Sequence, residues 1–183
     1  MIEIKNLTVV LGSKTVFENY DLTLPDRGIV LLWGESGIGK TTLLRVLCGL
    51  TKPQSGTITG LEHRRISVAF QEPRLIDHLS ALDNVALVSD RAKAERLLKD
   101  LNLSEELHQK AGKLSGGQKQ RVSLARAFAF SDDVVLLDEP FTGLDEQNKA
   151  RAAELIRRAK LAIVVSHDAS DAALLSIDRK IIL

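Results

Sequence analysis

A glycine-rich loop constrains this chain more than any other stretch. The loop reads Gly34-Glu35-Ser36-Gly37-Ile38-Gly39-Lys40-Thr41-Thr42, which completes the pattern G-x-x-x-x-G-K-[ST]. The apolar run 29–33 precedes it and apolar residues at helical spacing follow it, which is the strand–loop–helix setting that the pattern requires. Glycines let backbone N–H groups face a phosphate chain, and a helix start adds its positive dipole end. The loop therefore predicts a nucleotide phosphate site rather than an ordinary glycine-rich turn.

Two residues of this loop have predicted roles of their own. Lys40 is expected to reach the terminal phosphates of the nucleotide, where its ammonium group offsets their charge. The hydroxyl of Thr41 is expected to ligate Mg²⁺.

Length and composition favour one globular domain. The 183 residues suffice for a full hydrophobic core but are few for two domains, so residues 1–183 are predicted to form a single unit. A net charge of +1 gives no general attraction to nucleic acid, and no nucleic-acid partner is expected. The single cysteine, Cys48, excludes an internal disulfide and fits a reducing compartment. No apolar run approaches the roughly 20 residues that span a bilayer, so another chain would have to cross any membrane.

The pattern of apolar residues and caps predicts an α/β fold. Residues 2–24 indicate two antiparallel strands, and the apolar runs 29–33 and 134–137 are continuous enough to predict strands buried on both faces. Further strands are predicted within 53–60 and over 66–70, 162–165 and 179–183. Helices are predicted over 40–49, 80–88, 94–101, 105–109, 115–130, 145–159 and 172–175. The result is a mainly parallel core sheet with an antiparallel N-terminal part and a mainly helical insert over about 71–113.

Polar residues follow the predicted strands where the phosphate loop also lies. Ligands of open α/β sheets sit at the carboxyl ends of strands, so Asp138 and Glu139 should point at the loop. Asp138 is expected to hold Mg²⁺ through a water, and Glu139 to polarise a water in line with the γ-phosphate. His167 follows the next buried strand and is expected to contact the γ-phosphate, while Gln71 can reach the metal or the water. The alternative is that the Asp-Glu pair only caps the following turn.

A second candidate anion site lies further along the chain. The stretch Leu114-Ser115-Gly116-Gly117-Gln118 places a serine cap and two glycines at a helix start. A single small domain does not need two such helix starts to bind one nucleotide. We therefore expect two copies to associate head to tail, each offering this site to the ATP of the other. The alternative is a glycine-rich helix start without a ligand.

Together these stretches resemble the ATP-binding cassette (ABC) ATPases, a class of P-loop NTPases, in the family's order and over nearly the whole chain. The matching stretches are Gly34–Thr42 (Walker A), Gln71 (Q-loop), Leu114–Gln118 (signature), Val134–Asp138 (Walker B) with Glu139, Leu144-Asp145 (D-loop) and His167 (H-loop). The resemblance implies MgATP hydrolysis in a dimer that holds two ATPs, each between Walker A of one copy and the signature of the other. Asp145 is implied to lie at this shared site, and Gln71 beside a docked partner.

Phe70–Leu75 and Leu82–Val85 look most like importer cassettes of the nitrate, sulfonate and taurine type. This likeness implies a cytoplasmic ATPase subunit, held at the inner face of the cell membrane by a permease that docks near Gln71–Val88. One alternative is a soluble ABC ATPase of DNA repair or translation, although the insert is short and only one cassette is present. Another is a nucleotide-binding regulator without turnover, against which Glu139 and His167 argue.

Three features depart from the family pattern. Leu11 stands where an aromatic residue usually stacks on adenine, which predicts weaker nucleotide binding or less preference for adenine unless Phe17 or Tyr20 substitutes. The sequence ends at Leu183, where family members usually continue, which implies a compact or truncated cassette without a regulatory domain. Trp33 precedes the loop in place of a smaller aliphatic residue and is read as a core residue.

Overall fold

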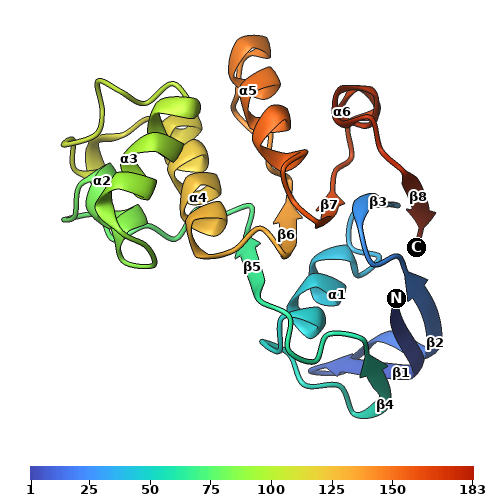
Figure 1. Ribbon diagram of the computed structural model, residues 1–183. Coiled ribbons are helices and arrows are strands. Elements are labelled where there is room, and N and C mark those ends of the chain that lie inside the picture. The colour runs from blue at the N-terminus through green and yellow to red at the C-terminus, as the bar shows by residue number, and fades with distance from the viewer.

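A five-stranded parallel sheet forms the centre of the computed structural model, which describes residues 1–183 (Figure 1). The strand order is β5-β6-β7-β3-β8, and every neighbouring pair is parallel. The strands are β3 (Gly28–Trp33), β5 (Ile66–Ala69), β6 (Val134–Asp138), β7 (Leu161–Val165) and β8 (Arg179–Ile182). Because all five run the same way, their carboxyl ends meet along one edge of the sheet.

A second, antiparallel sheet is built mainly from the start of the chain. It contains β1 (Ile2–Leu11), β2 (Lys14–Leu24) and β4 (Ser55–Thr59) in the order β2-β1-β4. The turn between β1 and β2 passes through Gly12, whose φ of 62° suits glycine. This arrangement confirms the predicted fold of a parallel core sheet with an antiparallel start.

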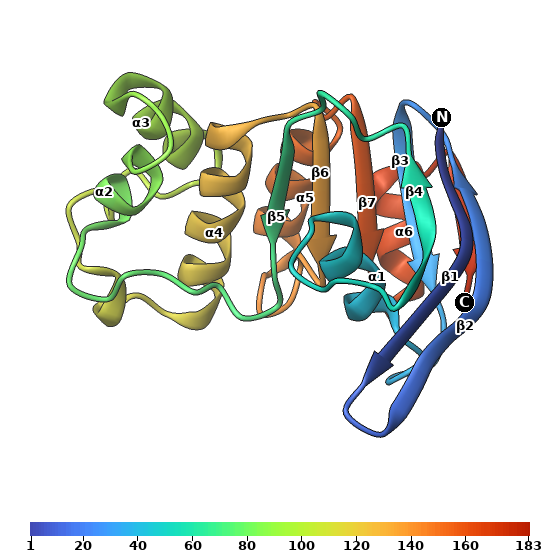
Figure 2. The same cartoon turned by 90° about the horizontal axis from the view of Figure 1, so that it is seen from below.

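Three helices cover the two faces of the parallel sheet, and three others form a group beside it. They are α1 (Lys40–Leu47), α2 (Ala81–Ala86), α3 (Arg91–Asp100), α4 (Gly116–Phe130), α5 (Glu146–Ile156) and α6 (Ala169–Leu175), with a 3₁₀ turn η1 (Ala111–Lys113). Figure 2 shows α1 on one face of the parallel sheet and α5 and α6 on the other. Helices α2, α3 and α4 pack together at the β5 side of the sheet. None of the helices combines the length and apolarity needed to cross a lipid bilayer.

The core lies on both faces of the parallel sheet. Side chains alternate along β3, so Ile29 and Leu31 pack toward the helices of one face while Val30 and Leu32 pack toward α1 and the antiparallel sheet. All residues of β6 and β7 are buried. This double burial is why these strands are apolar apart from Asp138 at the end of β6.

The predicted helix over residues 105–109 is wrong. The segment forms turns, and its carbonyl groups accept hydrogen bonds from the start of α2: Leu82 N donates to Leu107 O at 2.9 Å and Ala81 N to Gln109 O at 3.0 Å. So short a helix gains too few internal bonds to compete with such tertiary partners. Helix α6 also begins earlier than predicted, because the Asp168 carboxylate caps it by accepting the Ser170 N–H at 2.9 Å.

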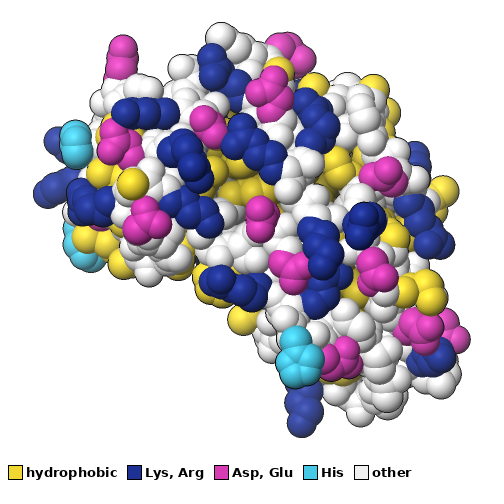
Figure 3. All heavy atoms as spheres, viewed as in Figure 1, with side chains coloured by type: hydrophobic (Ala, Val, Ile, Leu, Met, Phe, Trp, Pro, Cys, Tyr) yellow, Lys and Arg dark blue, Asp and Glu magenta, His cyan; other side chains and the backbone are white.

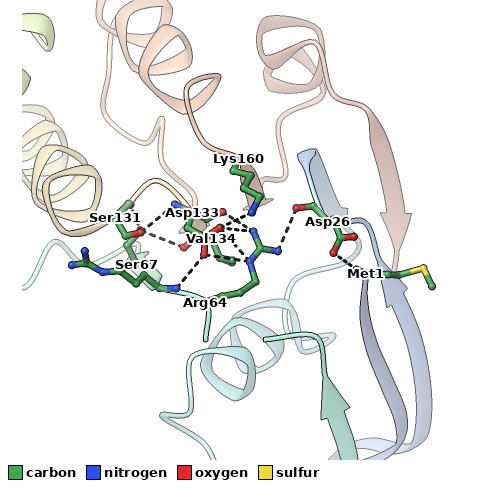
Figure 4. A network of polar contacts seen from close by, with 9 residues as sticks. Met1, Asp26, Arg64, Ser67, Ser131, Asp133, Val134 and Lys160 are labelled. Atoms are coloured by element: carbon green, nitrogen blue, oxygen red, sulfur yellow. Dashed lines mark hydrogen bonds and ion pairs between the residues drawn. The ribbon is translucent and has the colours of Figure 1, made fainter. Parts of the chain in front are cut away.

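An ion-pair network ties the strands together at their amino ends, opposite the edge with the polar residues (Figure 4). Arg64 Nη2 donates to Asp133 Oδ1 at 2.8 Å, and Lys160 Nζ lies 3.4 Å from the same oxygen. Hydrogen bonds from Arg64 lower the pKa of Asp133 from 3.8 to about 2. The pair therefore stabilises the fold at neutral pH, and this contribution is lost as the pH falls from 3.8 toward about 2. On the face of the molecule drawn in Figure 3, positively and negatively charged side chains are interspersed.

Candidate nucleotide site

Four strand ends of the parallel sheet meet at one cavity. Strand β3 leads into the glycine-rich loop, β6 ends at Asp138 with Glu139 after it, His167 follows β7, and Gln71 follows β5. The cavity measures about 620 Å³. Its lining is Leu11, Lys14, Val16, Ser36, Gly37, Gly39, Lys40, Thr41, Thr42, Gln71, Asp138, Glu139, Val165 and His167. The fold thus brings most of the loop and all the polar strand-end residues to one place.

The glycine-rich loop closes tightly on the β1–β2 hairpin. Gly39 has a φ of 122°, and a Cβ built on it would lie 2.7 Å from Val16 Cγ1 and 2.8 Å from Phe17 Cζ, so only glycine fits. Lys40 is the first residue of α1 and is 8% exposed. Its ammonium donates to the carbonyls of Gly34 at 2.7 Å and Glu35 at 2.9 Å. These bonds hold the lysine across the phosphate cradle. Gly34, Glu35 and Ile38 complete the loop without lining the cavity.

The donor set beside Lys40 fits Mg²⁺. The Thr41 hydroxyl donates to Asp138 Oδ2 at 2.7 Å, so both oxygens face one point, and Asp138 is 3% exposed. Burial raises the pKa of Asp138 because it disfavours the charged carboxylate. No cluster of three or more His, Cys, Asp or Glu forms a metal cage within the chain. A hydroxyl and one carboxylate, completed by phosphate oxygens and water, is a coordination that Mg²⁺ accepts.

Glu139 occupies a strained backbone position that aims it into the cavity. Its φ is 51°, a left-handed conformation that costs a non-glycine residue roughly 1–2 kcal/mol. Bonds from Glu139 N to Val165 O at 2.9 Å and from Gln120 Nε2 to Glu139 O at 3.4 Å hold it there. Its Oε1 lies 2.8 Å from His167 Nδ1, and this contact raises the pKa of the otherwise exposed His167. Backbone strain of this kind is typical of functional sites.

Gln71 lies on an exposed segment that α4 holds in place. Gln71 itself is exposed and lines the cavity beyond the end of β5. Half-buried Arg126 of α4 donates to the carbonyls of Pro73 at 2.9 Å and Arg74 at 3.1 Å. The helix that begins at the second candidate anion site therefore contacts the segment that carries Gln71.

That second site lies outside the cavity of its own chain. The Ser115 hydroxyl caps α4 by accepting the Gln118 N–H at 3.2 Å, and Gln118 Oε1 accepts the Ser115 N–H at 2.8 Å. The N–H groups of Gly116 and Gly117 make no hydrogen bond within the chain, as expected for a helix start. Asp145 caps α5 by accepting the Asn148 N–H at 2.8 Å and also lies outside the cavity.

Three contributors to the site carry no motif in the sequence. Lys14 and Val16 reach the cavity only because the β1–β2 hairpin folds over the loop. Gln120, which bonds the Glu139 carbonyl, lies on the first turns of α4, where its position after the Ser115 helix start is the one available signal.

Comparison with known proteins decides the family. The model of the ABC transporter family matches residues 17–142. This chain belongs to that family. The cassette is 38% identical to the aliphatic sulfonates import ATP-binding protein SsuB 1 of Streptomyces avermitilis, covering 100% of this chain and 72% of the relative. It is 39% identical to SsuB of Zymomonas mobilis, with 100% and 81% covered. The Fe(3+) ions import ATP-binding protein FbpC of Agrobacterium fabrum is 37% identical, with 98% and 57% covered.

Solved cassettes share the fold of this one. The dimeric structure of the ATP-binding cassette MJ0796 in a post-hydrolysis state bound to ADP and Pi superposes with a TM-score of 0.86 at 29% identity. The match covers 100% of this cassette and 94% of that chain. A further dimeric structure of MJ0796 gives a TM-score of 0.83 at 28% identity, with 100% and 94% covered.

Adjacent glycines of the signature provide a matched pair of variants. A Cβ on Gly117 would lie 2.4 Å from the carbonyl oxygen of Gly143, whereas a Cβ on Gly116 has nothing within 4 Å. We expect Gly117→Ala to lower the free energy of unfolding by about 1–3 kcal/mol through overpacking. Gly116→Ala should leave that energy unchanged or raise it by up to about 1 kcal/mol, because alanine favours a helix. Urea unfolding of both variants measures the difference, and equal stabilities would contradict the close contact.

Proposed function

We propose that this chain is the ATP-hydrolysing subunit of an ABC importer, working as a head-to-tail dimer beneath a separate permease. The observation that carries the proposal is the meeting of the phosphate loop, Asp138, Glu139 and His167 at one cavity. Membership of the ABC transporter family supports the ATPase activity, and the names of the relatives support import.

The phosphates of ATP lie along the loop in this proposal. Backbone N–H groups and Lys40 hold the β- and γ-phosphates, and Lys40 exchanges its bonds to the Gly34 and Glu35 carbonyls for phosphate oxygens. Thr41, Asp138 and Gln71 would hold Mg²⁺, which would supply positive charge to offset that of the phosphate oxygens. Glu139 accepts a proton from the attacking water, and His167 orients the Glu139 carboxylate and contacts the γ-phosphate.

A second copy completes the site. The free N–H groups of Gly116 and Gly117, together with the Ser115 hydroxyl, form a helix start suited to an anion, but these residues do not line the cavity of their own chain. In a head-to-tail pair each helix start meets the γ-phosphate on the loop of the other copy, with Asp145 nearby. The dimeric state of the related cassettes supports this arrangement.

The permease docks on the segment from Gln71 to Val88. Three apolar side chains of this segment are exposed, Ile76 at 38%, Leu87 at 56% and Val88 at 37%. Buried Asn84, at 0% exposure, fixes the backbone of Ile76 by accepting its N–H at 2.8 Å and donating to its carbonyl at 3.1 Å. The segment thus presents exposed apolar side chains on a backbone that Asn84 holds in place, and the same segment carries Gln71. A movement of the docked permease can therefore be transmitted to the nucleotide site.

Uptake measurements in cells test this proposal. In a strain lacking the chain, the wild type should restore uptake of labelled alkanesulfonate or ferric ion, the solute classes in the names of the relatives. Leu87→Asp should lower that uptake by about tenfold or more, because burying an unpaired charge in the interface costs desolvation free energy. Leu50→Asp is the matched control, since Leu50 is 62% exposed outside this segment. Greater solute accumulation in the deletion strain would indicate an exporter and contradict the proposal.

A further inference from the structure

Two stretches of one chain that the proposed function assigns to the ATP of the neighbouring copy pack on each other. Helix α4 begins after Ser115, and α5 begins after Asp145. Gly117, in the first turn of α4, lies against Gly143, because a Cβ on Gly117 would stand 2.4 Å from the Gly143 carbonyl oxygen. Neither Ser115 nor Asp145 lines the cavity of its own chain. A residue that fixes these two stretches relative to each other therefore acts outside that cavity.

Buried Arg121 connects α4 with the end of α3 and the start of α5. Its side chain belongs to a residue that is 7% exposed. Arg121 Nη1 donates to the carbonyl oxygens of Leu101 and Asn102, each at 2.7 Å, where α3 ends. The same nitrogen donates to Asn148 Oδ1 of α5 at 3.0 Å. Acceptors from two other elements thus hold the guanidinium group in one position.

Asn148 carries this connection on to Asp145. Asn148 is 8% exposed, and its Nδ2 donates to Asp145 Oδ2 at 3.0 Å while its Oδ1 accepts from Arg121. A side-chain amide has both an acceptor and donors, so it can join a cation to a carboxylate. The amide of Asn148 is therefore the polar link between the guanidinium group on α4 and the carboxylate that precedes α5.

The cap of α5 does not need this amide. The backbone N–H of Asn148 already donates to Asp145 Oδ1 at 2.8 Å, which is the bond that caps the helix. Burying a guanidinium group costs desolvation free energy, and apolar side chains of similar size fill such a space without that cost. The bridge from Arg121 to Asp145 is thus better explained by a need for one fixed arrangement of α4 and the start of α5.

We propose that Asn148 is a positioning residue for the shared nucleotide site. Together with Arg121 it holds Asp145 and the Ser115 helix start in the relative position that the ATP of the neighbouring copy requires. The proposal rests on the head-to-tail dimer of the proposed function. Its consequence is an effect on the other copy: loss of the Asn148 amide impairs hydrolysis at the loop of the neighbour and leaves the cavity of its own chain unchanged.

A mixture of two inactive chains separates these two effects. In a pair of a Glu139→Gln chain and a Ser115→Arg chain, the one intact site combines the Ser115 helix start of the first with the loop and Glu139 of the second. Asn148→Ala is added to either chain. Alanine keeps the backbone N–H that bonds Asp145 and favours a helix, so α5 retains its cap. Removal of Arg121 is less suitable, because it also leaves two carbonyl groups without their donor.

The position of the substitution decides the expected result. Asn148→Ala in the Glu139→Gln chain should lower the phosphate release of the mixture about threefold to tenfold, the scale of losing one or two hydrogen bonds. In the Ser115→Arg chain it should leave the release unchanged, because that chain supplies only its loop and Glu139 to the intact site. Gln147→Ala in the Glu139→Gln chain is the control, since exposed Gln147 precedes Asn148 and should not change the release.

Each single chain with Asn148→Ala should bind ATP as tightly as its parent, because Asn148 lies outside the cavity. A loss of phosphate release in both placements would overturn the proposal, since the amide would then serve its own chain. A loss in neither placement, or only in the Ser115→Arg chain, would overturn it as well. Failure of the proposed function is a different result: the mixture recovers no activity even when both chains keep Asn148.

Discussion

Replacement of Glu139 by glutamine is expected to lower ATP hydrolysis by about 10²–10⁴-fold, the usual scale for loss of a general base. Glutamine keeps the size of the side chain but cannot accept the proton of the attacking water. The strained backbone at φ 51° and its bonds to Val165 and Gln120 do not depend on the carboxylate, so the fold should persist. ATP should still bind, because the phosphate loop is untouched.

Phosphate release and nucleotide binding measured on the same preparation check this prediction. Glu146→Gln is the control, since this acidic side chain is 91% exposed at the start of α5 and lies outside the cavity. It should hydrolyse ATP as the wild type does. A Glu139→Gln chain that turns over ATP at the wild-type rate would show that another group accepts the proton.

The same variant should form a stable dimer with MgATP, and Ser115→Arg in that background should prevent it. In the proposed dimer, each unhydrolysed ATP stays between the loop of one copy and the Ser115 helix start of the other. Arginine removes the serine cap and fills the space that this arrangement assigns to the γ-phosphate on the other copy. Loss of the cap alone costs about 0.5–2 kcal/mol, so the folded fraction must be measured as well.

Light scattering with and without MgATP gives the molecular mass of each variant. Ser115→Thr in the Glu139→Gln background is the control, because threonine keeps the capping hydroxyl. The molecular mass of the threonine control should double with MgATP, as that of Glu139→Gln alone does. The arginine variant should remain a monomer. An arginine variant that is folded and still dimerises would place Ser115 away from the shared nucleotide.

Local chemistry allowed much of this fold to be predicted from the sequence. Ser115 caps α4 with a full capping box, and the helix runs to Phe130 as its pattern predicts. The apolar runs of β3 and β6 are buried on both faces, so the polar residues after them had to meet at one sheet edge. Capping boxes and apolar runs depend on residues that are neighbours in sequence, so they can be recognised without the structure.

Features that depend on distant partners could not be predicted. Residues 105–109 have a capping serine before them, yet their carbonyls bond the start of α2 instead of each other. Lys14 and Val16 enter the cavity through the fold of the hairpin, which no local pattern signals. The left-handed backbone of Glu139 likewise results from bonds to Val165 and Gln120, on β7 and α4.

Mixing two inactive chains tests the shared site most directly. A Glu139→Gln chain keeps its Ser115 helix start, and a Ser115→Arg chain keeps its Glu139, so a head-to-tail pair of the two contains one intact site. Each chain alone should release almost no phosphate from MgATP, whereas an equal mixture should recover activity, up to roughly half of the wild-type value, because each mixed pair contains one intact site of two. A mixture that stays as inactive as its components, although both chains are folded and bind ATP, would contradict the account.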